Sequence, residues 1–319
     1  MRPTLRLRAV TAPPSDPGVP LAALRLRRSL AWPVGQAEAE CSLSVQPPDA
    51  GAKVVIEGAA DGDSLKPLFT GRVLRRAQGL WGISLLIEEA TGPLTRLHLD
   101  KAVSAGTAAQ VVGDLCQAAG VEAAVEPPGA QLPSRVLLSN RSAMDHILRL
   151  AQMSGWLLRT DTGGKLHAGM PPLAPAGVVL RPQDPVLELR VADDPDEPAG
   201  GAITGDGALG VGGPGAESWL LQSLSGISGG DGLPALHLPG LKLMADVTKA
   251  ATMESLRLRE SRFGRTVTLA GIPQADIGEV ILLLGFGGGD GPARVVGLEV
   301  LWSAEEGLIS RLDLQGLGA

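Results

Sequence analysis

Hydrophobic and polar residues alternate along much of the first hundred positions. Leu5 and Leu7 alternate with arginines, and the same period of two returns around residues 24–27 and 68–76. This period is typical of strands that bury one face. Short strands that follow one another closely, separated by turns rich in Gly, Pro and Asp, predict a first β unit over residues 1–100, a small barrel or sandwich.

The pattern changes to a helical period after residue 101. Thr107 can cap a helix, Gln110 can reach back to the cap, and Gly120 can end the helix in a left-handed conformation. Apolar residues then share one face of the predicted helix, at Ala108, Val111, Val112, Leu115 and Ala119.

The same signals recur one helix later. Ser142 is the expected cap, Asp145 is its third-position partner, and Gly155 is the expected stop. Residues 156–168 then predict a hairpin with a Gly-containing turn. Residues 101–170 therefore predict a small α/β unit inserted into a β chain.

Strand patterns return over residues 171–319, which predict a second β unit. A glycine-rich run from Gly200 to Gly215 predicts a long polar loop. Asp246 is the expected cap of a third helix that reaches about Arg262, and the chain closes with a strand hairpin. The fold class predicted for the whole chain is α+β, mainly β.

Two predicted hairpins resemble each other. Residues 71–86 and residues 297–314 each pair a strand that begins at a glycine with a second strand after a short turn. Identity between them is thin, so chance likeness and internal duplication both remain open.

Composition limits the function classes. With 43 Gly and 25 Pro, the chain favours short strands joined by turns, and its net charge of −6 argues against a general nucleic-acid-binding protein. Cys41 and Cys116 are too few for a disulfide framework, and we expect buried thiols in a reducing compartment. We find no signal peptide and no apolar segment of membrane length, and we expect synthesis in the cytoplasm.

No catalytic, cofactor or metal site is predicted. The histidines are scattered, at His98, His146, His167 and His237. The run from Gly285 to Gly291 leads into a strand rather than a helix, which makes a hairpin loop a better interpretation than a dinucleotide site. The acidic residues from Asp193 to Glu197 could hold a divalent cation, but a solvated loop is the simpler interpretation. Lys165 follows two glycines without the rest of a phosphate loop.

The order of these elements carries a family resemblance. A β unit that ends near Phe69–Val73, a Thr-capped helix that ends at Gly120, the segment from Arg141 to Trp156 and the hairpin around Lys165 together resemble the baseplate hub proteins of contractile-tailed phages. This group includes the late control protein D family and the hub portion of type VI secretion spike proteins. The resemblance covers residues 60–170 well and the C-terminal β unit loosely.

The resemblance implies two tube-like β-barrel domains, 1–100 and 171–319, with the α/β insert 101–170 between them. It also implies a homotrimer whose six barrel-like units form a ring that joins a hexameric tail tube to a trimeric spike. Baseplate wedge proteins are further implied partners, and DNA would pass through a net acidic lumen without specific binding. The location implied is the virion tail baseplate. Because nothing after Leu314 has a needle pattern, we expect the spike to be a separate chain.

Two other classes remain open. A β-rich surface- or carbohydrate-binding module would need exposed aromatic residues in a groove, and five Trp without Tyr is poor material for one. A hub-linked cell-wall hydrolase would need paired carboxylates or a zinc site, and we expect no enzymatic activity.

Overall fold

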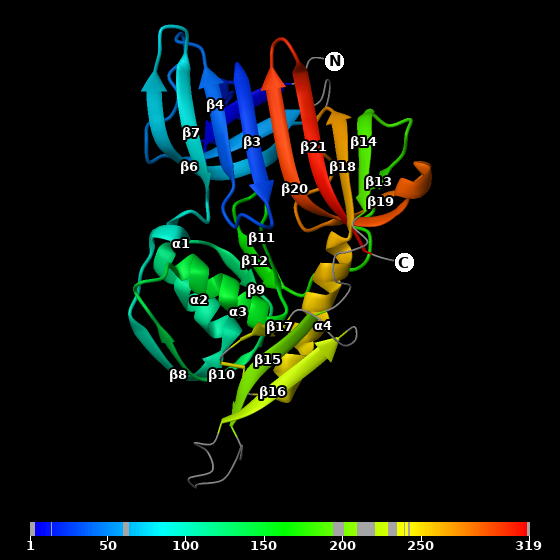
Figure 1. Cartoon of the computed structure of the whole chain (residues 1–319). Coiled ribbons are helices and arrows are strands. Elements are labelled where there is room, and N and C mark those ends of the chain that lie inside the picture. The colour runs from blue at the N-terminus through cyan, green and yellow to red at the C-terminus, as the bar shows by residue number, and fades with distance from the viewer. Residues whose placement is uncertain are drawn as a thin grey trace.

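A computed structural model describes residues 4–13, 15–59, 64–193, 201–208, 221–228, 235–238, 240–241 and 243–317. Most strands of the two β units belong to one 13-stranded sheet that curls into a half-barrel (Figure 1). The first unit contributes β1 (Thr4–Ala9), β2 (Val19–Pro20), β3 (Ala23–Ser29), β4 (Gln36–Cys41), β5 (Lys53–Ala59), β6 (Lys66–Gln78) and β7 (Ile83–Glu89). The second contributes β13 (Val179–Leu180), β14 (Val186–Asp193), β18 (Phe263–Ala270), β19 (Val280–Leu283), β20 (Gly291–Ser303) and β21 (Gly307–Gly316), with a 3₁₀ turn η2 (Gly287–Gly289) before β20. The prediction of a mainly β chain is confirmed.

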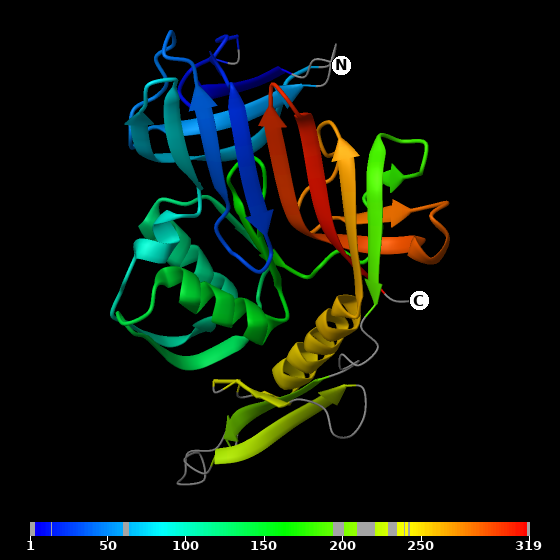
Figure 2. The same ribbon diagram turned by 45° about the horizontal axis from the view of Figure 1, so that its top comes forward.

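The long strands alternate between a buried and an exposed face. In β3, Leu24 and Leu26 are buried while Arg25 and Arg27 face solvent, and β21 follows the same rule. The buried face packs against the shorter strands, which turn behind the long ones at each end of the sheet (Figure 2). Aliphatic side chains from both units therefore form a single core.

The two units have the same strand order. In the first unit the order is β3-β4-β7-β6-β5, and in the second it is β14-β18-β21-β20-β19. If only these five strands of each unit are numbered along the chain, both orders are first, second, fifth, fourth, third. The short strands β2 and β13 and the strand β1 are left out of this comparison. A β-bulge also interrupts the corresponding hairpin in each unit, between Val73 and Arg75 and between Val295 and Gly297. This shared topology favours internal duplication over chance likeness.

The bulges correct the residue correspondence expected from the sequence. Val73 pairs with Ile87 just as Val295 pairs with Leu314. Gly297 therefore corresponds to Arg75, and the alignment of Gly71 with Gly297 is wrong by four residues. The error arose because a glycine can mark a strand start or a bulge equally well.

The units meet edge to edge rather than as separate sheets. β3 pairs antiparallel with β20, with Glu299 opposite Arg27 and Val300 opposite Leu26. Among the described strands, neither unit closes a barrel through its own hydrogen bonds. We call the β3–β20 pairing the internal seam.

The α/β unit has the two helices that the sequence predicts, and it also has a short third one, α1, before residue 101. Leu94 of α1 packs in the same core as α2 and α3, so this unit begins earlier than predicted. Its elements are α1 (Pro93–Arg96), β8 (Lys101–Thr107), α2 (Ala108–Ala119), β9 (Ala123–Val125), β10 (Gln131–Leu137), α3 (Ala143–Ser154), β11 (Leu157–Thr160) and β12 (Leu166–Gly169). Thr107 and Ser142 each form a capping box, with Gln110 and Asp145, and Gly120 and Gly155 end the helices in the left-handed conformation. β11 and β12 form the predicted hairpin.

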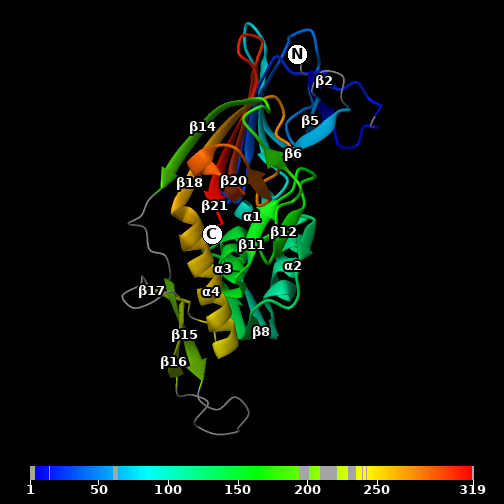
Figure 3. The ribbon, with the colours of Figure 1, turned by 90° about the vertical axis from the view of Figure 1, so that its right-hand side faces the viewer.

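A later segment packs on the α/β unit instead of the half-barrel. β15 (Gly201–Ala208), β16 (Leu221–Ser228) and β17 (Ala235–His237) form a small sheet, and α4 (Met244–Ser261) connects it to β18 (Figure 3). Ile203 and Val247 belong to the same core as α2 and α3. Part of the predicted polar loop is thus strand β15, and the rest lies outside the described residues.

The start of α4 differs from the prediction. Its N-cap is Leu243, which makes no side-chain cap bond, and Asp246 lies in the first turn. The Asp246 carboxylate instead accepts a hydrogen bond from the Gln131 backbone N–H at 3.1 Å. An acidic residue in a first helical turn resembles a cap in sequence, but here it ties α4 to β10.

Candidate assembly surface

The histidines do not come together. His98 and His146 contact the backbone carbonyls of Ser139 and Leu138, His167 pairs with Asp161 at 2.7 Å, and His237 contacts Thr204. Within the described ranges, no group of three His, Cys, Asp or Glu side chains could hold a metal ion.

The other candidate site residues from the sequence either have structural roles or lie outside the described residues. Cys41 and Cys116 are buried, and burial raises the pKa of each thiol to about 11. In the glycine-rich hairpin loop, the Asp290 carboxylate accepts hydrogen bonds from the backbone N–H groups of Gly285 and Phe286. Asp193 is the last residue of β14, and the rest of the acidic run lies outside the described residues.

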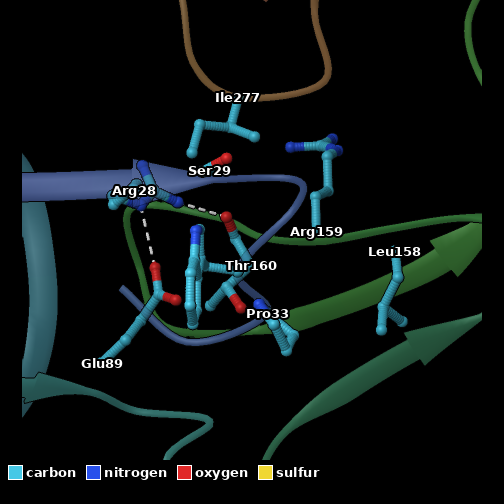
Figure 4. Close-up of a pocket in the computed structure, with 9 residues that line it drawn as sticks. Arg28, Ser29, Pro33, Glu89, Leu158, Arg159, Thr160 and Ile277 are labelled. Atoms are coloured by element: carbon cyan, nitrogen blue, oxygen red, sulfur yellow. Dashed lines mark hydrogen bonds and ion pairs between the residues drawn. The ribbon is translucent and has the colours of Figure 1, made fainter. Parts of the chain in front are cut away.

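A buried arginine joins the β units to the α/β unit. The Arg28 side chain is 1% exposed, and its Nε donates to Glu89 at 2.8 Å (Figure 4). Its two Nη groups donate to the Asp276 carboxylate and to the Thr160 carbonyl. Burial raises the pKa of Glu89, although Arg28 and the backbone N–H of Gly35 act against that rise. The adjoining cavity is about 10 Å³, room for roughly one water molecule, which makes this cluster a structural clamp and not a ligand site.

A larger groove of about 920 Å³ runs between α3, α4 and the lower end of the sheet. Apolar side chains such as Leu148, Trp156 and Met253 line it. Its two innermost charges, Glu260 and Arg294, bind each other, and therefore neither is available to a ligand.

The exposed face of the sheet carries charges of both signs. Arg25 and Arg27 both donate to Glu299 across the internal seam, at 3.2 and 2.7 Å. Farther along the face, Arg190 pairs with Glu188 at 2.7 Å. Solvent-exposed pairs of this kind contribute about 0–1 kcal/mol each to the free energy of unfolding. Their main effect is to neutralise charge on this face of the sheet.

Two long strands of the sheet, β14 and β6, have an edge without a partner among the described strands, and the two-residue strands β2 and β13 also pair on one side only. β14 pairs with β18 on one side only. The outer half of β6, residues 74–78, pairs only with β7, because β5 ends its pairing at Arg72. An unpaired edge offers backbone donors and acceptors to another strand.

Some of the large exposed hydrophobic side chains lie at these same edges. Leu80 and Trp81, at the tip of the β6–β7 hairpin, are 85% and 92% exposed. Leu74 on β6 and Leu187 and Val191 on β14 are exposed as well. Sequence reasoning missed these residues, because their alternation does not tell an exposed edge from a core strand. Contiguous exposed apolar side chains mark an interaction surface.

Solved structures share this fold over nearly the whole chain. The 43 kDa tail protein of prophage MuSo2 from Shewanella oneidensis matches with a TM-score of 0.70 and 17% identity, covering 98% of each chain. The chain has the fold of a phage tail protein. A tail protein from Neisseria meningitidis matches with a TM-score of 0.71 and 14% identity, covering 99% of this chain and 97% of that one.

A third match comes from a secretion system. A component of the Escherichia coli type VI secretion system gives a TM-score of 0.64 at 10% identity, covering 97% of this chain and 76% of its own. No protein-family description and no curated protein matches the sequence. The expected likeness to tail proteins is therefore confirmed at the level of the fold. No helix in the described ranges is long and apolar enough to span a membrane.

Proposed function

We propose that this protein is a structural baseplate hub of a phage tail or a related contractile injection system. Three copies form a ring of six β units, and the ring joins a hexameric tail tube to a trimeric spike. The observation that carries this proposal is the repeated strand order of the two units, which are joined at the internal seam. Among the described strands, each unit also has a free edge on a long strand, at β14 and at the outer half of β6.

The geometry suits such a ring. A two-unit chain with unlike edges at its two ends forms a head-to-tail contact, and such contacts close into rings when the rotation permits. Six similar units in three chains also present repeated surfaces to a sixfold tube, while the chains themselves keep threefold symmetry for a spike. The fold shared with tail proteins supports the same role.

The exposed face of the sheet is the proposed lining of the channel. On this face Arg25 and Arg27 share the Glu299 carboxylate, and Arg190 pairs with Glu188. The described part of this face is thus mixed in charge. The net charge of the chain, −6, predicts a net acidic lumen instead. A face with charges of both signs neutralises fewer phosphates than a basic face does, so DNA would pass without specific binding.

The α/β unit and α4 lie below the half-barrel (Figures 1 and 3). We assign this side to contacts with baseplate wedge proteins, and the rims of the ring to the tail tube and the spike. The assembled protein belongs to the virion tail baseplate and is made in the cytoplasm of the bacterial host. It has no enzymatic role in this proposal.

The oligomeric state tests the proposal. Sedimentation or light scattering should give three times the chain mass, and class averages of the purified protein or of intact particles should contain a ring with an axial channel. A protein that stays monomeric in solution and is absent from an axial ring in particles overturns the proposal. A peptidoglycan-cleavage assay should show no activity, and cleavage above a buffer control would favour the hydrolase alternative.

A further inference from the structure

We propose that β14 of one copy pairs with the free outer half of β6 in the next copy, with Ala77 opposite Ala192. This inference rests on the proposed ring, and it adds the residues and register of the contact between chains. The partner is a second copy of this chain.

The internal seam is the precedent. In the second unit, the lower half of β20 pairs with β19, and its outer half pairs with β3 from Gly297 to Trp302. In the first unit, the lower half of β6 pairs with β5, and the backbone of Val73 bonds with Gly51 and Ala52. Beyond Val73, no described strand lies where β3 lies in the second unit. β14, the counterpart of β3, has its outer edge free.

The register follows from the pairings within each unit. Gly297 corresponds to Arg75 through the shared bulge, so Glu299 corresponds to Ala77. On the other strand, Arg27 faces Gln36, and Gln36 faces Glu88.

The second unit repeats this series. The matched pairs at the bulges are Val73–Ile87 and Val295–Leu314. Glu88 follows Ile87 and Gln315 follows Leu314, so Glu88 corresponds to Gln315. Gln315 faces Gly264, and Gly264 faces Ala192. Ala192 is therefore the counterpart of Arg27. Since Glu299 faces Arg27 across the internal seam, Ala77 faces Ala192 of the next copy.

Charge and shape fit this register. One step along, Arg76 faces Asp193 of the next copy, which places opposite charges directly across the strands. In the free chain Arg76 donates to the Asp49 carboxylate at 2.7 Å, a pair whose Asp49 side chain is 83% exposed, so the contact between copies shares or replaces a weak surface pair. In the same register the exposed tip residues Leu80 and Trp81 lie opposite Leu189 and Glu188, next to Leu187, which is 60% exposed. The same place in the internal seam holds Trp302, which packs on the core and donates its Nε1–H to the Leu21 carbonyl.

The internal seam and the proposed β6–β14 contact between copies differ in one respect, and this difference suits a contact that forms after folding. Leu298 and Val300 are buried in the internal seam, whereas their counterparts Arg76 and Gln78 are polar. A polar outer half keeps the edge soluble in the free chain, because polar edges resist unspecific strand pairing. Along residues 75–78 the contact between copies then relies on backbone pairing and charge, and apolar burial is confined to the hairpin tip at Leu80 and Trp81.

Cysteine pairs test the register. Opposed residues on antiparallel strands have Cα atoms about 4.5–5.5 Å apart, which suits a disulfide. The variant carrying A77C and A192C should give covalent dimers and trimers on non-reducing gels after mild oxidation, and reductant should remove them. The control carries A77C with V191C, whose side chain lies on the other face of β14, and should link far less. The native cysteines are buried and stay unchanged.

The outcomes separate the register from the ring. A trimeric wild-type protein in which the control links and the A77C/A192C variant does not would overturn the register and leave the ring standing. A monomeric wild-type protein with no link in either variant would overturn both. Equal linking in both variants would show a mobile edge and overturn the register too.

A charge exchange gives a second measurement. The exchange is made in a background that carries Asp49→Asn, which removes the partner of Arg76 within its own chain. In that background, Arg76→Asp alone should weaken trimer formation by roughly fivefold for each contact between copies, because two carboxylates would then face each other. Asp193→Arg alone should have a similar effect, and the double exchange should restore association. Two single losses that simply add in the double variant would contradict the proposed Arg76–Asp193 contact.

Discussion

The guanidinium of Arg294 lies against the carboxylate of Glu260 with two N–O distances of 2.9 Å, and the two side chains are only 2% and 9% exposed. The pair joins the C-terminal turn of α4 to β20. Arg294 also donates to the carbonyls of Pro172 and Gly278, so one side chain ties together the sheet, the helix and two connecting segments.

Removing one partner of this pair should strongly destabilise the protein. Arg294→Ala leaves the Glu260 charge buried without its partner, and we expect a loss of about 3–5 kcal/mol in the free energy of unfolding. Urea denaturation measures it. Arg311→Ala, at an exposed arginine on the neighbouring strand, is the control and should cost less than about 1 kcal/mol. Equal losses in the two variants would contradict the assigned role of the buried pair.

Two glycines of the first long helix should respond in opposite directions to alanine. Gly113 lies inside α2, and a Cβ there would meet no atom within 4 Å, so Gly113→Ala should stabilise the protein by about 0.5–1 kcal/mol. Gly120 ends α2 at φ 66°, where an L side chain is strained, so Gly120→Ala should destabilise it by about 1–2 kcal/mol. Thermal unfolding followed by circular dichroism compares the two. A gain of stability at position 120 would refute the left-handed stop.

His146 should make stability depend on pH. Its pKa is lowered, chiefly by burial and further by the charges of Arg135 and Arg141, although its bond to the Leu138 carbonyl and the charge of Asp145 oppose this. Below the unfolded value of about 6.5, the unfolded chain binds a proton that the folded chain does not. Stability should therefore fall as the pH is lowered through and below that value, and stay level above it.

Unfolding free energies measured between neutral and mildly acidic pH test the His146 prediction. His146→Gln should flatten the dependence, while the same change at the exposed His98 should leave it in place. An unchanged slope in the His146 variant would assign the pH dependence to other groups.

The exposed hairpin tip should matter for assembly and not for folding. Trp81 is 92% exposed in the free chain, so Trp81→Ser should change the free energy of unfolding by no more than about 0.5 kcal/mol. The same variant should associate more weakly, as measured by sedimentation across a concentration series. A variant that unfolds more easily but assembles normally would show that the tip supports the fold instead.

Local signals made part of this structure predictable. The caps Thr107 and Ser142 and the stops Gly120 and Gly155 act within one turn of chain, so the sequence contains the whole interaction. The strands were recognisable from their alternation for the same reason.

Contacts between distant segments were not predictable. Nothing near Arg27 in sequence indicates that it faces Glu299, and the place of α4 depends on the buried pair formed by Glu260 and Arg294. The free edges became visible only once the pairing partners of β6 and β14 were known.

The internal seam also imposes an order on synthesis. Arg25 and Glu299, which form an ion pair across it, are 274 residues apart in the chain. While the ribosome makes the protein, the edge of β3 stays unpaired until β20 emerges, because strands so distant in sequence pair late. A chain cut short before β20 keeps that edge of β3 unpaired, so only chains that include β20 can present the two-unit sheet for assembly.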